Sequence, residues 1–99
     1  MNKYIELDDV IKNEMKSIEF AKHFERELLI NKIANMVYLL RSAAELTQKE
    51  LADKVETTQP VIARLENGRD SRMPSIELLA KIATATGNEL NISWHSQAA

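Results

Sequence analysis

The stretch spanning residues 47–68, TQKELADKVETTQPVIARLENG, constrains the fold most, because it carries two sets of helix boundary signals at close spacing. Thr47 and Glu50 form a capping box, in which each side chain accepts a hydrogen bond from a backbone N–H. Thr58 is placed as a second N-cap, with Pro60 in the first turn where its missing N–H costs nothing. Gly68 supplies the left-handed residue that ends a helix. The stretch therefore predicts two short helices that meet at a tight corner.

Apolar residues in this stretch recur at helical spacing. The expected inner faces are Leu51, Ala52 and Val55 in the first helix, and Val61 or Ile62 with Leu65 in the second. Such a corner presents its second helix to the major groove of DNA. Gln59 and Arg64 lie on that helix, and amide and guanidinium groups can make bidentate contacts to adenine and guanine. The alternative for Arg64 is an exposed salt bridge to Glu66 or Asp70.

The segment TTQPVIARLENG resembles the recognition segment of the lambdoid phage repressor and Cro family, and Gln48 falls where that family places a phosphate-contacting Gln. Two positions depart from the family pattern: Glu56 replaces the usual Gly of the turn, and Pro60 replaces a polar side chain that often reads a base. The resemblance implies a lambda-repressor-like domain. The expected DNA contacts are Gln48, Thr58, Gln59, Pro60, Val61, Arg64, Asn67, Arg69 and Arg72.

Length and composition favour one small intracellular binding domain. A chain of 99 residues can bury one modest core. It has no Cys, and its two His residues are far apart, so we expect no disulfide, metal site, cofactor or catalytic cluster, and no enzyme activity. No apolar run reaches membrane-spanning length and the N-terminus lacks a signal-peptide core, which fits a cytoplasmic protein. The net charge of −2 argues against a non-specific nucleic-acid coat but not against a specific DNA reader.

Residues 17–44 contain no Pro or Gly and predict one long helix or two nearly continuous helices, preceded by a short helix within residues 1–16. This long helix has two apolar faces. The face expected in the core is Leu29, Ile33, Met36, Val37, Leu40 and Ala44; the roughly opposite face is Phe20, Phe24, Leu28 and Tyr38. We interpret Phe20, Phe24 and Leu28 as a surface for a partner. The alternative is that the segment before residue 17 folds back over them.

Residues after Gly68 predict a further helix and a strand. Ser75 is placed as the N-cap of a helix over residues 76–86, which Gly87 ends. The segment ELNISW then alternates apolar and polar residues, which is typical of a strand with Leu90, Ile92 and Trp94 on one face. A lone strand needs a partner, so we expect it to pair with its copy in a homodimer. The alternative is an irregular tail.

Together these elements predict an all-α protein: a five-helix helix-turn-helix domain with one C-terminal dimerisation strand. The expected parts are an N-terminal helical extension (1–28), the DNA-binding domain (29–88) and the C-terminal strand and tail (89–99). This arrangement resembles the HigA-type antitoxins of type II toxin–antitoxin pairs. The resemblance implies a homodimer that binds the double-stranded operator DNA of its own operon and neutralises a toxin, a RelE-like mRNA endonuclease. The alternative is a prophage-type transcriptional repressor without a toxin partner.

Overall fold

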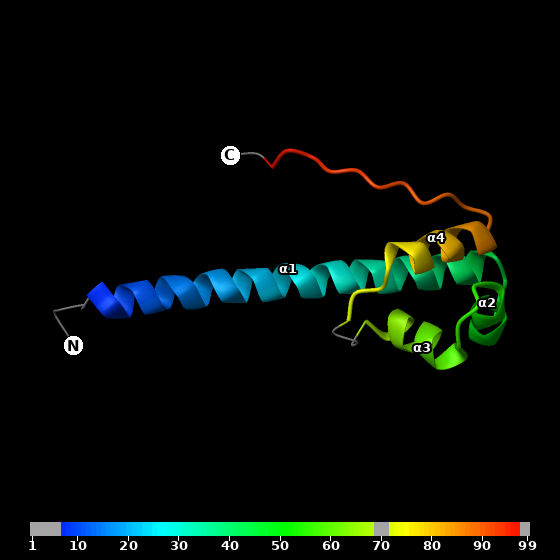
Figure 1. The fold of residues 1–99 in the computed structure, drawn as a ribbon, viewed down its shortest axis with the longest axis horizontal. Helices are drawn as coiled ribbons and strands as arrows, with labels where there is room; N and C mark the ends of the chain where they lie inside the picture. Colours follow the sequence, from blue (N-terminus) through cyan, green and yellow to red (C-terminus); the bar gives the residue numbers. More distant parts are fainter. Residues whose placement is uncertain (1–6, 69–71, 98–99) are drawn as a thin grey trace.

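The computed structural model describes residues 7–68 and 72–97, and within them it has four helices and no strand. The helices are α1 (Leu7–Ala43), α2 (Gln48–Lys54), α3 (Gln59–Asn67) and α4 (Ile76–Ala85). Figure 1 shows α1 as a long rod, with the other three helices gathered around its C-terminal end. The molecule is accordingly elongated, with extents of 62 × 30 × 20 Å. No helix in the described ranges has both the length and the apolar character needed to span a membrane.

The prediction of five helices is wrong, because the short helix expected before residue 17 is the beginning of α1. Residues 7–43 contain neither Pro nor Gly, so nothing interrupts the helical hydrogen bonding. For the same reason residues 7–16 do not fold back as the alternative required, and residues 1–6 lie outside the described part of the chain. Residues 7–16 continue along the axis of α1 and leave Phe20 and Phe24 uncovered.

The predicted C-terminal strand is also wrong. Residues 88–97 run extended beyond α4 and form no ladder with any other described segment (Figure 1). Alternation of apolar and polar residues is not sufficient for a strand, because a ladder needs a second row of backbone groups at hydrogen-bonding distance. Leu90 is half-buried, whereas Ile92 and Trp94 are exposed. The dimerisation strand is therefore absent from the structure.

The core lies at the C-terminal end of α1. Its four largest fully buried side chains are Val37, Leu51, Ile62 and Ile82, and each comes from a different helix. Burying an aliphatic side chain of this size stabilises a fold by roughly 1.5–3 kcal/mol. These four residues therefore hold α2, α3 and α4 against the last turns of α1.

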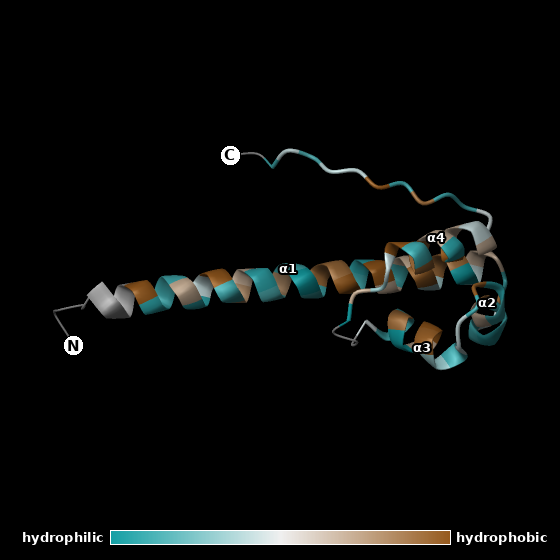
Figure 2. Cartoon of the chain, viewed as in Figure 1, coloured by the Kyte–Doolittle hydropathy of each residue, from teal (hydrophilic) through white to brown (hydrophobic). Residues whose placement is uncertain are grey.

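The face of α1 that enters this core is rotated from the predicted one. Ile30 and Ala34 are buried with Val37, although only Val37 was expected there. Of the other predicted core residues, Ile33 and Leu40 pack at the edge of the core, while Leu29 and Met36 are 49% and 59% exposed. Figure 2 shows hydrophobic residues continuing along α1 well beyond the three short helices. Much of the apolar surface of α1 is therefore uncovered in the single chain.

Candidate nucleic-acid interface

The first motif helix begins at the predicted capping box. The Glu50 backbone N–H donates to Thr47 Oγ1, and the Thr47 backbone N–H donates to Glu50 Oε1, both at 3.0 Å. The hydrogen bonds to Thr47, led by the one from its backbone N–H, lower the pKa of Glu50. The capping box fixes where α2 starts, and with it the position of Gln48 in its first turn.

The turn between α2 and α3 keeps a tight shape despite its unusual residue. Glu56 has φ 59°, a left-handed conformation that favours glycine. The turn is closed by the Thr57 backbone N–H, which donates to the Ala52 carbonyl at 2.9 Å. A side chain in this conformation costs roughly 1–2 kcal/mol. Glu56, which departs from the phage-repressor pattern, is therefore strained, but the turn still closes.

The ends of α3 are as predicted. Thr58 is the N-cap residue, although only its carbonyl, not its hydroxyl, accepts hydrogen bonds from the first turn. Gly68 closes the helix at φ 68°, and a Cβ built there would lie 2.7 Å from Asn31 Oδ1 on α1. The end of α3 is therefore seated closely on α1, which fixes the orientation of the helix.

A nearly buried ion pair ties α3 to α1. Arg41 donates to both carboxylate oxygens of Glu66, from Nε at 2.6 Å and from Nη2 at 2.8 Å, and its Nη1 donates to the Leu46 carbonyl at 2.8 Å. The two side chains are only 15% and 6% exposed. The hydrogen bonds to Glu66 raise the pKa of Arg41. Glu66 is thus held by Arg41 rather than by Arg64, which removes one of the alternatives proposed for Arg64.

The Glu66 carboxylate also accepts a hydrogen bond from an amide side chain at the start of α2, which in turn contacts one at the start of α3. Gln48 Nε2 donates to Glu66 Oε1 at 3.4 Å, and Gln59 Nε2 donates to Gln48 Oε1 at 2.8 Å. Two amide groups from different helices are therefore oriented together. Gln59, which is exposed, keeps its amide oxygen available as an acceptor for a base edge or a backbone donor.

The outward face of α3 consists of Pro60, Arg64 and Asn67, which are all exposed and follow helical spacing. Ile62 is fully buried and Val61 is half-buried, so the structure decides which of these two belongs to the core. Ala63 shares this outward side and is half-exposed, although it was not among the predicted contact residues. The sequence did carry a signal for Ala63, because its spacing from Arg64 places it on the same side of the helix. The face combines one cation, one amide and small apolar groups, which suits contacts with base edges.

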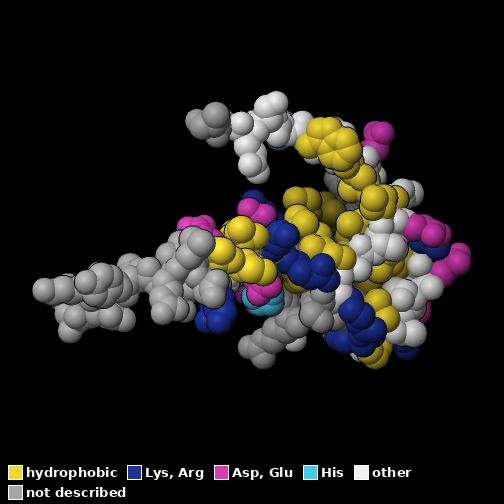
Figure 3. Space-filling model, turned by 60° about the vertical axis from the view of Figure 1, so that its left-hand side comes forward, with side chains coloured by type: hydrophobic (Ala, Val, Ile, Leu, Met, Phe, Trp, Pro, Cys, Tyr) yellow, Lys and Arg dark blue, Asp and Glu magenta, His cyan; other side chains and the backbone are white. Residues whose placement is uncertain are grey.

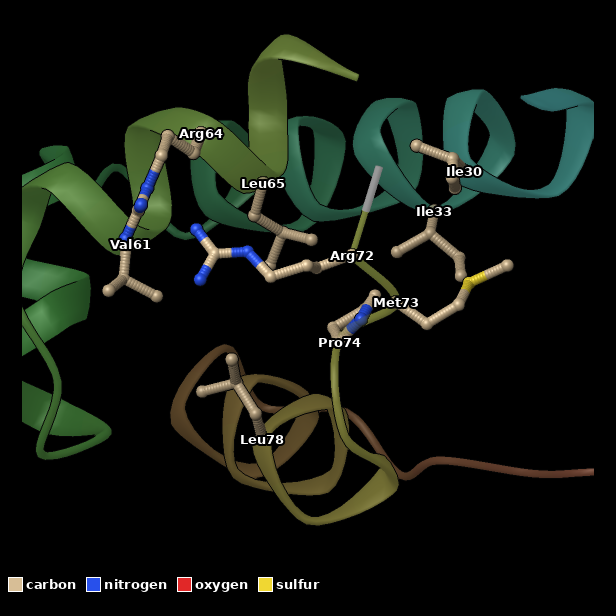
Figure 4. Close-up of a pocket in the computed structure, with 9 residues that line it drawn as sticks. All are labelled: Ile30, Ile33, Val61, Arg64, Leu65, Arg72, Met73, Pro74 and Leu78. Atoms are coloured by element: carbon tan, nitrogen blue, oxygen red, sulfur yellow. The ribbon is translucent and has the colours of Figure 1, made fainter. Parts of the chain in front are cut away.

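Arg72 adds a second cation beside α3. It lines a small hollow of about 210 Å³ together with Val61 and Arg64. In Figure 4 its side chain reaches back from the segment before α4 toward α3. Both arginines are exposed. Positive groups at this edge suit phosphate contacts, which position a protein on DNA without reading sequence.

The structure thus brings together the predicted contacts Gln48, Thr58, Gln59, Pro60, Val61, Arg64, Asn67 and Arg72 around the exposed side of α3. Arg69 lies outside the described residues. The ion pair of Arg41 and Glu66 was not anticipated, because its members are far apart in sequence and either looks like an ordinary surface charge. Among the described residues no cluster of acidic or His side chains could hold a metal ion.

The predicted partner surface lies apart from this site. Phe20, Phe24 and Leu28 are 71%, 52% and 44% exposed on the part of α1 that projects from the core. The two phenyl rings stack with centroids 6.3 Å apart and an angle of 9° between their planes. This apolar face is therefore exposed in the single chain, and its role as a partner surface stays a prediction.

Comparison with known protein families identifies the domain in which these residues lie. A helix-turn-helix family model matches residues 37–92, more than half of the chain, and this range contains α2, the turn and α3. Neither a curated protein nor a solved structure matched the chain. The matched range begins at Val37, a buried residue of α1, and it leaves most of α1 outside. The chain therefore belongs to the helix-turn-helix family of sequence-specific DNA-binding transcription regulators.

Proposed function

We propose that this protein is a HigA-type antitoxin, which represses its own operon as a dimer and neutralises a partner toxin, a RelE-like ribonuclease. One observation carries the antitoxin part. Phe20, Phe24 and Leu28 are exposed on a segment that lies outside the matched helix-turn-helix range. The competing function is a prophage-type repressor without a toxin, which would use the same motif but has no need for this surface.

The three residues have the character of an interface hot spot. Large aromatic side chains that follow helical spacing are the usual anchors when a helix lies in the groove of a partner. The two rings stack with centroids 6.3 Å apart, so they form one contiguous apolar patch. The surface is therefore prepared to bind a protein with an apolar groove.

Binding to the operator is tested by two single substitutions. Arg64→Ala should lose discrimination at one base pair, at a cost of roughly 1–3 kcal/mol, because Arg64 is exposed at the centre of the outward face of α3. Gln48→Ala should weaken binding to all sequences alike, because a phosphate contact carries no base information. Titration against a set of point-substituted operators measures both effects. An unchanged sequence profile for Arg64→Ala would contradict the assigned role.

Toxin binding is tested with the product of any small reading frame that adjoins the gene. The doubly substituted Phe20→Ser/Phe24→Ser protein should no longer co-purify with that product or rescue growth when it is expressed, while operator binding stays unchanged. Glu19→Ser/His23→Ser is the matched control, because it changes two exposed residues on another side of the same turns. If no toxin-like product adjoins the gene, or if the control and the test variants rescue equally, the repressor without a toxin is the better description.

A further inference from the structure

The projecting half of α1 carries an apolar stripe that the proposed toxin surface does not use. Ile11, Met15 and Ile18 follow helical spacing and are 49%, 58% and 52% exposed. At about 100° per residue they lie on the same side of α1 as Leu29 and Met36, roughly opposite the stacked phenyl rings. One long stripe therefore runs along α1, and α4 covers only the edge of its C-terminal end.

The C-terminal part of this stripe forms the floor of a groove. A hollow of about 550 Å³ lies between α1, α4 and the extended segment, and its lining includes Leu29, Ile33, Met36, Leu40, Leu79 and Leu90. Figure 3 shows hydrophobic side chains on both sides of the gap between the C-terminal segment and the helices. The groove thus offers apolar surface to a helix that lies along α1.

Two charged residues divide the stripe. Lys22 and Glu25 lie on it between the set Ile11, Met15 and Ile18 and the set that begins at Leu29. If two copies of α1 lie antiparallel with a two-fold axis between these residues, Lys22 of each copy faces Glu25 of the other. The same register places Ile18 opposite Leu29 and Ile11 opposite Met36. In a parallel pair, Lys22 would instead face Lys22, and Glu25 would face Glu25.

We propose that α1 pairs antiparallel with α1 of a second copy, so that Ile11, Met15 and Ile18 of each chain enter the groove of the other. The interface is isologous, since each copy contributes both the apolar residues and the groove. Between residues 11 and 36 the two helices overlap along about 38 Å. This surface deepens the dimer in the proposed function, and leaves the Phe20 and Phe24 face free for a toxin.

Two features favour a second copy over another occupant. The charges of Lys22 and Glu25 are complementary to those of an antiparallel copy, and the same register sets Ile18 and Ile11 opposite Leu29 and Met36, which line the groove. In addition, the side chains of residues 11–28 are all exposed, and an isolated helix of such mixed composition is marginal in water. Antiparallel pairing would bury the apolar members of this stretch in both copies.

Cross-linking tests the register, because the natural chain has no Cys. A mixture of Ile18→Cys protein and Leu29→Cys protein should form an intermolecular disulfide on mild oxidation, whereas neither variant alone should. Both positions are about half exposed, so the substitutions leave the core intact. Cross-linking of Ile18→Cys with itself would indicate a parallel pair and overturn the proposal. A dimer by light scattering in which the mixture does not cross-link would overturn this interface but not the dimer of the proposed function.

Charge exchange provides a second test. Lys22→Glu and Glu25→Lys should each raise the dimer dissociation constant about tenfold, because each places like charges at two points of the interface. Mixing the two variants should restore dimers, since every facing pair then has opposite charges. If each substitution weakened the dimer only by destabilising its own helix, mixing the two variants would not restore dimers. A chain that sediments as a monomer throughout, or closure of the groove by its own Ile92 and Trp94, would refute the pairing.

Discussion

The two halves of α1 differ in how far their side chains are buried, although both halves mix apolar and charged residues. In the C-terminal half, Ile30, Ala34 and Val37 are buried by the three short helices. In residues 11–29, every side chain is exposed. A continuous helix can therefore be part of a folded domain at one end and an open surface at the other, because helical hydrogen bonds are local whereas burial depends on neighbours.

The polar side-chain pairs of the two halves make the same contrast. Arg41 and Glu66 form a bidentate pair with little exposure, and it joins two helices. His23 and Glu27 lie 2.9 Å apart within one helix, with side chains 70% and 59% exposed. Similar distances thus have different energetic meaning, because water screens the second pair and is largely excluded from the first.

The largest expected effect is the difference in stability loss between a substitution in the core and one in the projecting part of α1. Leu51→Ala should lower the free energy of unfolding by about 2–5 kcal/mol, because Leu51 is fully buried and the substitution leaves a cavity. Phe20→Ser/Phe24→Ser should change it by less than about 0.5 kcal/mol, since both rings are exposed. Urea unfolding of both proteins measures the difference. A comparable loss in the two variants would show that the projecting half is packed in the single chain.

The next effect compares the Arg41–Glu66 ion pair with the exposed His23–Glu27 pair. Arg41→Met should cost about 3 kcal/mol, because it leaves the Glu66 carboxylate nearly buried without its cation. Glu27→Gln should cost at most about 0.5 kcal/mol, as expected for an exposed pair within a helix. Thermal melts at neutral pH provide the measurement. Equal losses would mean that the Glu66 carboxylate is more hydrated than its burial indicates.

A smaller effect of opposite sign is expected at the motif turn. Glu56→Gly should raise stability by about 1 kcal/mol, because glycine relieves the left-handed strain and gives back only part of the gain as chain entropy. Glu56→Ala is the control, since alanine keeps the Cβ that causes the strain. A rise in stability would show that the turn between α2 and α3 is strained by the Glu56 side chain. A lower melting temperature for Glu56→Gly would assign the Glu56 side chain a stabilising role.

The smallest effect concerns pH. The pKa of Glu50 is lowered from its ordinary value of 4.5 in the folded protein, so its contribution to stability is complete above that value. It is lost as the pH falls below 4.5 and through the folded pKa. Glu50→Gln should therefore be slightly less stable than the natural protein at neutral pH and should converge with it in acid. Melting temperatures measured across this range test the sign, and a gap that widens in acid would contradict it.

Local signals predicted most of the motif. The capping box at Thr47, the positions of Thr58, Pro60 and Gly68 in α3, and the Ser75 cap of α4 all depend on residues within one turn of each other. Such short-range preferences can be read directly from the chain. The exposed residues of α3 followed from the same signals, because once a helix is placed its outward face is set by spacing. Ala63 was overlooked although this spacing included it.

Features that depend on distant neighbours were predicted less well. The hydrophobic pattern of α1 showed two apolar faces but not which rotation meets the core, so Leu29 and Met36 were assigned to the core instead of Ile30 and Ala34. The C-terminal alternation was interpreted as a strand although no second strand exists in the described residues. The pairing of Arg41 with Glu66 had no local signal at all.

The sequence by itself determined where α2, α3 and α4 begin and end, that α2 and α3 form a helix-turn-helix, and that α1 has more apolar surface than one small core can use. Caps, turns and helical periodicity are set by neighbours along the chain, so they need no knowledge of the fold. Only the tertiary structure decided which side of α1 is buried, that α1 is one helix projecting beyond the domain, and that Arg41 holds α3 in place. Those outcomes depend on the relative energies of packing alternatives between distant segments, and the single-chain pattern permits several of them.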